Sequence, residues 1–574
     1  MDHSSSIVAS SDNNSLQAPA AVAAILPLAL LTGCGGGGGG GDSAAAPVAA
    51  APPPAATAPV VTPLPTGPSA AEASRFLAQA SMGATREQIA RVQSLGYAGW
   101  LDEQFAVPAS GTRWDYLVAR GLNNISNKNG EAGADATIWR KLLSSPDTLR
   151  QRITFALSEI LVTSVSGFSG GWKAFTAAAY LDLLETEAFG NYRRLLEKVS
   201  TSPAMGEFLT YRGSVKFRAS TGALPDENYA RELMQLFTIG LVNLNPDGTP
   251  KLVGGQQEET YGLDDIAGLA RVFTGWNYDL AGGNTDTPDY KRRPMIVNAS
   301  AHETGSKTFL GKTIAAGLSG EESLKQALDT IFAHSNMAPF VSRQLIMRLV
   351  CSNPSPAYVT RVAAVFNNDG AGARGNLTAV VKAILLDSEA RSAPPPSDVR
   401  FGKQREPILR FAAWARAFKA SSASDAWAVG NTSDPATRLG QSPLRAASVF
   451  NFFRPGYVPP NSAVASAGMV APEFQLTNES SVVGYVNYMQ TVVSRGVGDV
   501  KGDYSALLPL ADTAQLLLDE LNLVLAAGQL STTTMSLLKG AIDAMPSGSD
   551  SARTNRIHAA LTLVLAAPEF IIQK

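Results

Sequence analysis

Apolar residues recur at helical spacing along most of the chain after a Pro-rich N-terminal segment. After Ser145-Pro146, for example, Leu149, Ile153 and Leu157 share one face of a helix whose first turn holds Asp147. The same spacing predicts helices over residues 74–80, 85–96, 97–105, 180–187, 192–200, 226–239, 264–274, 321–334, 338–350, 357–367, 377–386, 405–418, 482–493, 513–527, 533–545 and 552–565. No convincing series of alternating strands accompanies them, so the sequence predicts an all-α fold.

Two segments interrupt the helical pattern. Residues 243–260 contain the turn sequence Asn245-Pro246-Asp247-Gly248 and are the best candidate for a small hairpin, and residues 295–310 are the second. Long loops are expected at 120–134, 241–262, 277–320 and 454–472, and loops of such length are usually functional or disordered. We therefore expect a large multi-helix body with long loops and at most a small β-hairpin.

The N-terminus has the pattern of a bacterial lipoprotein signal. An apolar run from Ala20 leads into Leu31-Thr32-Gly33-Cys34, and this run is shorter than the roughly 20 residues of a membrane span. Cleavage before Cys34 would remove residues 1–33 as a signal peptide and leave a lipidated Cys34. Gly35, rather than Asp, follows the cysteine, so the predicted location is the outer membrane, facing the periplasm.

Two alternatives to the signal peptide stay open. Secretory signals normally begin with basic residues, but the first Lys or Arg of this chain is Arg75. The segment is then either an Ala-rich disordered tail or a signal whose true translation start lies elsewhere.

Residues 34–69 are rich in Gly, Ala and Pro and contain nothing that can build a core. The glycines favour a flexible coil and the prolines an extended chain, which predicts a disordered tether. The helical body then covers residues 70–574.

Charge and cysteine content exclude some classes of function. Asp2 and Asp12 are the charged residues within 1–33, so the rest of the chain has 47 basic and 47 acidic residues. A neutral body argues against nucleic-acid binding and against electrostatic attachment to a membrane. If Cys34 carries lipid, Cys351 has no cysteine partner, and its apolar surroundings indicate a buried thiol.

The most polar predicted helix begins at Asp226. Glu227 and Arg231 are four residues apart and can form an ion pair, and Asn228 and Glu232 form the neighbouring polar row. The functional interpretation makes Glu227 and Glu232 an acid and a base, or metal ligands, beside a cleft, with Asn228 and Arg231 binding the ligand. The two glutamates lie about 140° apart around a helix, so a structural salt-bridge network is the alternative.

The loop sequence 301–311 offers the second candidate. His302 is a possible proton carrier, Lys307 a possible anion-binding group, and the aromatic Trp276 a possible ligand contact at the end of a preceding helix. The structural alternatives are that His302 is a loop residue bonded to a nearby carbonyl and that Trp276 fills space in the core. The body has three histidines and no ligand motif, so the sequence predicts no metal and no cofactor.

Several of these segments together resemble one bacterial family. They are Arg75 to Thr85, Trp100 to Phe105, Glu227-Asn228-Tyr229-Ala230-Arg231-Glu232-Leu233-Met234-Gln235-Leu236-Phe237, Leu269 to Trp276 and His302 to Gly311. Their order is similar to that in the family catalogued as domain of unknown function 1800, over about residues 72–573. Gln235 departs from the Glu expected there, which disfavours a carboxylate-rich metal helix.

The resemblance implies an exported, mostly helical bacterial protein with no established activity. Members often sit beside a gene for an exported protein that resembles sulfatases, which makes such a protein a possible partner.

Two functions follow from the sequence. The first is a lipid-anchored scaffold or binding module of the cell envelope that works with an exported partner. The alternative is a hydrolase of an envelope or extracellular polymer, with Glu227 or Glu232 as acid or base and His302 as a second proton carrier. Whether the protein is an enzyme is left open.

Overall fold

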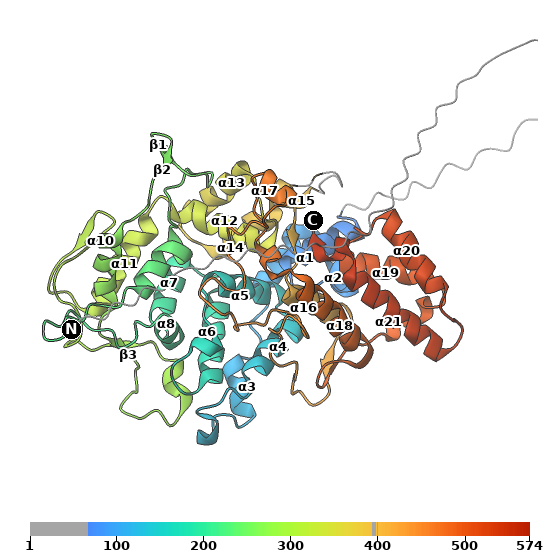
Figure 1. Cartoon of the computed structure of the whole chain (residues 1–574), viewed down its shortest axis with the longest axis horizontal. Coiled ribbons are helices and arrows are strands. Elements are labelled where there is room, and N and C mark those ends of the chain that lie inside the picture. The colour runs from blue at the N-terminus through green and yellow to red at the C-terminus, as the bar shows by residue number, and fades with distance from the viewer. Residues whose placement is uncertain (1–66, 393–397, 399) are drawn as a thin grey trace, which may run out of the picture. The chain divides into compact units, whose positions relative to one another are not determined.

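Helices follow one another through the residues that the computed structural model describes, 67–392, 398 and 400–574 (Figure 1). In the first part they are α1 Ala70–Ala80, α2 Arg86–Ala106, α3 Arg113–Ala119, α4 Ala134–Ser144, α5 Thr148–Ile160, α6 Lys173–Glu187, α7 Tyr192–Ser200 and α8 Pro203–Phe208. The central ones are α9 Asn228–Glu232, α10 Leu263–Ala270, α11 Gly320–Ala333, α12 Met337–Leu349, α13 Pro356–Asn367, α14 Leu377–Leu386 and α15 Ser388–Arg391. The last are α16 Pro407–Ala417, α17 Ala463–Ser466, α18 Glu479–Arg495, α19 Ala514–Ala526, α20 Thr532–Asp543, α21 Asp550–Ala566 and α22 Pro568–Ile571. The predicted all-α fold is confirmed.

Short helical turns fill several connections. They are η1 Ile125–Asn127, η2 Val165–Gly167, η4 Arg271–Phe273, η5 Pro288–Lys291, η6 Pro472–Leu476 and η7 Ser505–Leu510. The predicted signal peptide, the predicted lipidation site Cys34 and almost all of the predicted tether lie outside the described residues.

Helix boundaries differ from the predicted ones where capping residues decide them. Helix α1 begins at Ala70 because Ser69 and Glu72 form a capping box. Asp147 is the N-cap of α5 and not a first-turn residue. Helices α3 and α4 were not predicted. Helix α4 begins after Gly133, which has a positive φ and no capping side chain, so the sequence carries no start signal there.

The polar helix that the sequence predicts as one element is divided in two. Helix α9 ends at Glu232, and the chain continues as a π-helical turn, η3, over Leu233–Thr238. The Ile239 amide donates to the Met234 carbonyl at 3.0 Å, five residues back, as this wider turn requires. Gly240, directly after the predicted helix 226–239, has a φ of 72° and ends the segment.

The strands are two or three residues long and pair in twos in the described chain. The first pair, β1 Leu252–Val253 with β2 Gln256–Gln257, lies in the predicted hairpin and projects from the body in Figure 1. The other antiparallel pairs are β3 Trp276–Asn277 with β4 Ile296–Val297, β5 Lys307–Phe309 with β6 Lys312–Ile314, β7 Lys403–Gln404 with β10 Ile572–Gln573, and β8 Ser421–Ser422 with β9 Val500–Lys501.

Helix α5 lies at the centre of the packing. It contacts α2, α4, α6 and α12, and nearly all of its side chains are buried. Helix α1 packs against α19, and β7 pairs with β10, so both ends of the body are joined to the same core. In the part of the chain that is described, no helix has the length and apolar character needed to cross a membrane.

Candidate functional site

Six buried charged side chains meet on one side of α5. We call them the carboxyl cluster: Arg152, Glu159, Arg348, Lys403, Glu406 and Glu473. Each is at most 5% exposed. Arg152 and Glu159 are seven residues apart on α5 and therefore share a face of that helix. Arg348 comes from α12, Lys403 from β7, Glu406 from the N-cap of α16 and Glu473 from η6.

Lys403 connects two of the acids. Its ammonium group lies 2.9 Å from the Glu473 carboxylate and 3.8 Å from that of Glu406, and it donates to the carbonyls of Met347 and Arg348 at 3.0 and 2.9 Å. Gln441 donates to Glu406 at 2.7 Å. Lys403 is therefore fully occupied by acceptors.

Glu159 and Glu406 form a carboxyl pair. Burial raises the pKa of Glu159 well above its ordinary value, and the negative charge of Glu406 and a hydrogen bond to it act in the same direction. Burial also disfavours a charged Glu406, but the hydrogen bond from Glu159 and the cations Lys403 and Arg152 lower its pKa overall. The two opposed shifts favour a proton on Glu159 over one on Glu406.

Two small cavities touch Glu159. One, of about 20 Å³, is also lined by Leu236, Gln344 and Arg348, and the other, of about 10 Å³, by Gln441 and Asn451. Each has room for about one water molecule. Among the described residues, Nε and one terminal nitrogen of Arg348 find no hydrogen-bond partner. The cluster can therefore hold and share a proton, but no substrate fits beside it in this conformation.

A second region is open to solvent. A groove of about 310 Å³, which we call the basic groove, is lined by Gly213 to Arg218, Gly275, Asn277, Asn298, Ser300 and Ala301. Backbone hydrogen bonds fix its floor. The Gly213 amide donates to the Trp276 carbonyl and the Gly275 amide to the Ser214 carbonyl, both at 2.8 Å. The segment after Gly213 therefore lies along β3.

The lining of the basic groove is cationic and amphipathic. Lys216 and Arg218 supply positive charge, and Phe217 is 52% exposed beside them. Asn277 and Asn298 add amide groups. No lining residue is acidic, so this groove suits an anionic ligand with an apolar part.

The predicted polar row lies next to this groove. Glu227 and Arg231 form the predicted ion pair at 3.2 Å, and both side chains are 39% exposed. Asn228 donates to the Thr210 hydroxyl at 3.4 Å, and Thr210 donates to Asp226. The backbone amide of Asp226 donates to Ser214, so this end of the helix is joined to the groove wall.

Glu232 points in a different direction from Glu227. It is 7% exposed, and burial raises its pKa. The charge of Glu232 also acts on Tyr261. Burial and this negative charge raise the pKa of the Tyr261 hydroxyl to about 12. The pair predicted as acid and base is thus split between the surface and the interior, as the spacing of five residues implies.

His302 lies under the groove floor. It is 2% exposed, its Nδ1 lies 2.9 Å from the Thr274 carbonyl, and burial lowers its pKa. We assign the proton of the neutral ring to Nδ1, which leaves Nε2 as a buried acceptor. In the described part of the chain, no hydrogen bond or ion pair joins His302 to Glu227 or Glu232.

Lys307 and Trp276 are interior residues. Lys307 is fully buried and donates to Ser323 at 3.2 Å, and burial lowers its pKa. The Trp276 indole donates to the Val272 carbonyl at 3.1 Å. Their side chains do not line the groove, although the Trp276 carbonyl helps to hold its floor.

Comparison with known proteins identifies the family. The sequence profile described as "Protein of unknown function (DUF1800)" matches residues 75–572. The chain belongs to this family. No curated protein and no solved structure matches it. Among the described residues of this DUF1800 protein, no group of three or more His, Cys, Asp or Glu side chains is arranged to hold a metal ion.

Sequence reasoning missed the carboxyl cluster of this DUF1800 member. A signal did exist: Arg152 and Glu159 interrupt the apolar face of a helix at the spacing of two turns, which places two charges inside the core. Lys403, Glu406 and Glu473 carry no comparable signal, because short non-helical segments bring them together. Cys351 is buried as predicted, and burial raises the pKa of its thiol to about 12.

Proposed function

We propose that this DUF1800 protein is a lipid-anchored binding module of the cell envelope that holds an exported partner in the basic groove. The observation that carries the proposal is the contrast in access. The groove is open and has about 310 Å³ of space, whereas the cavities at the carboxyl cluster have about 10 and 20 Å³. Partner binding needs an accessible surface, and the groove offers one.

The chemistry of the groove favours an acidic, extended segment of a protein. Lys216 and Arg218 attract carboxylates, and Phe217 can pack against an apolar side chain. The backbone groups of the floor already bond to one another, so the side chains of the lining would supply most contacts to a bound segment. A sulfatase-like exported protein is the partner that the family resemblance implies.

The anchor rests on the sequence. Leu31-Thr32-Gly33-Cys34 supports cleavage before Cys34 and lipid attachment there, with residues 34–69 as a tether to the body. A lipoprotein cysteine carries two or more acyl chains, which hold a protein stably on a membrane. The proposed location is the outer membrane, facing the periplasm.

A crosslinking experiment in the native host tests the proposal. The lipidated protein is crosslinked lightly, purified and compared with Lys216→Met/Arg218→Met and with the matched surface variant Lys312→Met/Arg495→Met. Support requires a stoichiometric exported protein that is lost with the groove variant and kept with the matched one. Recovery of the protein alone, or equal capture by both variants, contradicts the proposal. A Cys34→Ala form that stays in the membrane fraction contradicts the anchor.

A second candidate function is supported by the carboxyl pair. Two carboxyls that share one proton, with the proton on Glu159, are suited to acid–base hydrolysis. The two carboxyls are close enough for a hydrogen bond, whereas those of a glycosidase stand about 5 Å or more apart. This hydrolase would have to move the segment with Gln441 and Asn451 to admit a substrate. It places the acid and base at Glu159 and Glu406, not at Glu227, Glu232 and His302.

A paired assay separates the two candidates. Envelope polymers are incubated with the purified lipoprotein, with Glu159→Gln and with Glu227→Gln. Turnover that disappears only in Glu159→Gln supports the hydrolase. Turnover that disappears only in Glu227→Gln would instead assign the acid or base to Glu227. Partner capture that both variants retain, with no turnover by the unaltered protein, leaves the binding module as the function.

A further inference from the structure

Arg405 lies buried at the start of α16 with part of its guanidinium unused. It is 4% exposed, and one terminal nitrogen donates to the Leu525 carbonyl at 2.8 Å. Its Nε and its other terminal nitrogen have no hydrogen-bond partner among the described residues. A buried cation with unused N–H groups is costly unless something compensates the charge.

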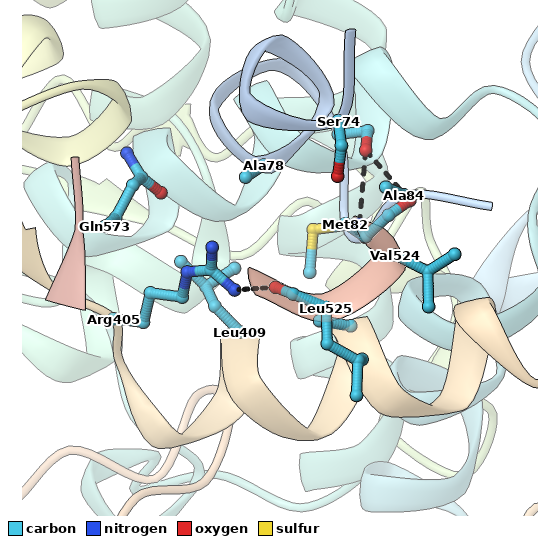
Figure 2. Close-up of a pocket in the computed structure, with 12 residues that line it drawn as sticks. Ser74, Ala78, Met82, Ala84, Arg405, Leu409, Val524, Leu525 and Gln573 are labelled. Carbon is cyan, nitrogen blue, oxygen red and sulfur yellow. Dashed lines mark hydrogen bonds between the residues drawn. The ribbon is translucent and has the colours of Figure 1, made fainter. Parts of the chain in front are cut away.

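These unused groups border a small cavity. Figure 2 shows the Arg405 guanidinium reaching in among residues of α1 and α19, with Gln573 of β10 on its other side. The cavity measures about 20 Å³. Its wall is mostly apolar and includes Ala78, Met82 and Leu409. It has room for one water-sized or slightly larger species.

The polar neighbours in the wall are already engaged. The Ser74 hydroxyl donates to the Leu523 carbonyl at 2.7 Å, the Ser81 hydroxyl to the Leu77 carbonyl at 2.7 Å, and the Gln573 amide to the carbonyls of Leu349 and Val350 at 3.0 and 3.1 Å. Arg405 therefore supplies the free donors of this cavity.

No acid balances Arg405. The lining contains no Asp or Glu, and in the described chain no carboxylate forms an ion pair with this guanidinium. The groups whose charge acts on it are Tyr485 and Arg410, and burial lowers the pKa of Arg405 to about 10. The Phe570 ring lies 5.0 Å from the guanidinium, which compensates only part of a full charge.

We propose that this cavity is a binding site for one small monovalent anion, of chloride size, held by Nε and the free terminal nitrogen of Arg405. The anion supplies the missing negative charge, and the apolar wall suits a weakly hydrated halide. Because α1, α16, α19 and β10 all line the cavity, the bound anion joins the two ends of the helical body.

Arg416, within α16, provides a matched control. Burial also lowers its pKa to about 10, but its nitrogens donate to the carbonyls of Leu142, Ser145 and Lys141 at 2.8, 3.0 and 3.5 Å. It is a half-buried arginine whose donors are satisfied by the protein. Its replacement should destabilise the fold without touching the anion site.

The first test is thermal unfolding of the full-length protein in mild detergent, with potassium chloride exchanged for potassium gluconate at constant ionic strength. Above the dissociation constant, the unfolding temperature should rise by about 1 °C for each tenfold rise in chloride. Arg405→Met should lose this slope and Arg416→Met should keep it. Bromide should replace chloride, and acetate, which is too large for the cavity, should not.

A crystal grown with bromide gives a readout that does not depend on stability. An anomalous peak within hydrogen-bond distance of Nε of Arg405 is the expected result. A water molecule there, together with a chloride slope that is equal in the unaltered protein and Arg405→Met, would overturn the proposal. If Arg405→Met does not fold, Arg405→Lys, which removes the paired donor edge, is compared instead.

Discussion

The carboxyl cluster holds six ionisable side chains that are at most 5% exposed, whereas the basic groove holds two cations and lies open to solvent. The cluster has the perturbed pKa values that mark many active sites, and the groove has the space that a ligand needs. A side chain with a perturbed pKa therefore need not lie where a ligand can reach it. In this protein the perturbed pKa values and the accessible space occur in different places.

The same contrast gives the two regions different energetic roles. Buried charges of opposite sign compensate one another in the cluster, so a change to one member leaves another buried and uncompensated. Charges at the groove are hydrated before and after any change. We therefore expect substitutions in the cluster to affect folding first and substitutions in the groove to affect binding first.

The largest effect is expected for Lys403→Met. This change leaves Glu473 and Glu406 buried without their cation, and such a loss costs about 3–5 kcal/mol of unfolding free energy. Chemical denaturation of the variant and of the unaltered protein measures it.

The control is Lys382→Met, which breaks a 2.7 Å ion pair with Asp102 that is exposed on both sides. A surface pair is worth about 1 kcal/mol or less. Equal losses in the two variants would mean that the cluster contributes no more than a surface bridge. Adding Glu473→Gln to Lys403→Met should restore part of the lost stability.

The second effect concerns the floor of the groove and is expected for Gly275→Ala. Gly275 has a φ of 84°, and a Cβ there would lie 2.8 Å from the Asn298 carbonyl oxygen and 3.0 Å from the His302 amide nitrogen. The left-handed backbone costs about 1–2 kcal/mol for alanine. The forced shift of backbone adds to this, so we expect a total of about 3 kcal/mol and a loss of partner binding.

Gly282→Ala is the matched change, because Gly282 has a φ of 76° with nothing within 4 Å of its Cβ position. This change should lower the unfolding free energy only by the cost of a left-handed alanine, and it should leave partner binding intact. If the two alanine variants unfold at the same denaturant concentration, the close approach at Gly275 is not what holds the floor.

Most of the fold could be predicted from the sequence, because apolar spacing and capping residues report on local structure. Helix α2 begins after its N-cap Thr85, where the predicted helix 85–96 starts, and its kink at Gly96 marks the junction with the predicted helix 97–105. The π-helical turn at Leu233–Thr238 could not be predicted, since its residues are compatible with an α-helix. Packing of η3 against α11 and α12 accompanies the wider turn.

The candidate sites were harder to predict, because they depend on contacts between distant segments. The Glu227–Arg231 pair was found, since both residues lie on one helix. The pairing of Glu159 with Glu406 joins positions 247 residues apart, and the groove joins 213–218 with 275–301. Neither arrangement follows from spacing along the chain.

A third prediction concerns pH and the carboxyl pair. An unfolded Glu has a pKa near 4.3, and the folded pKa of Glu159 is raised well above that. Between these values the folded state holds a proton that the unfolded state has released, so the unfolding free energy falls as the pH rises, by at most about 1.4 kcal/mol per pH unit. Glu159→Gln cannot lose this proton, so it should gain stability relative to the unaltered protein over the same interval.

Denaturation of both proteins at several pH values checks this, with the half-exposed Glu227→Gln as the control. His302, His334 and His558 all have pKa values lowered by burial, so they stabilise the fold as the pH rises toward 6.5. Their contribution is common to the variants and cancels in the difference. A difference between Glu159→Gln and the unaltered protein that does not change with pH would show that Glu159 is ionised in the folded state.

The smallest effect on stability is expected at the groove. Lys216→Met/Arg218→Met changes two solvated cations and should alter the unfolding free energy by no more than about 0.5 kcal/mol. The same variant should slow association with the partner and flatten its salt dependence, because charges at the edge of an interface act mainly on the encounter rate. Association rates measured on the captured partner at two salt concentrations test this. A stability loss as large as that of Lys403→Met would show that Lys216 and Arg218 stabilise the fold. The groove and the cluster would then have the same energetic role.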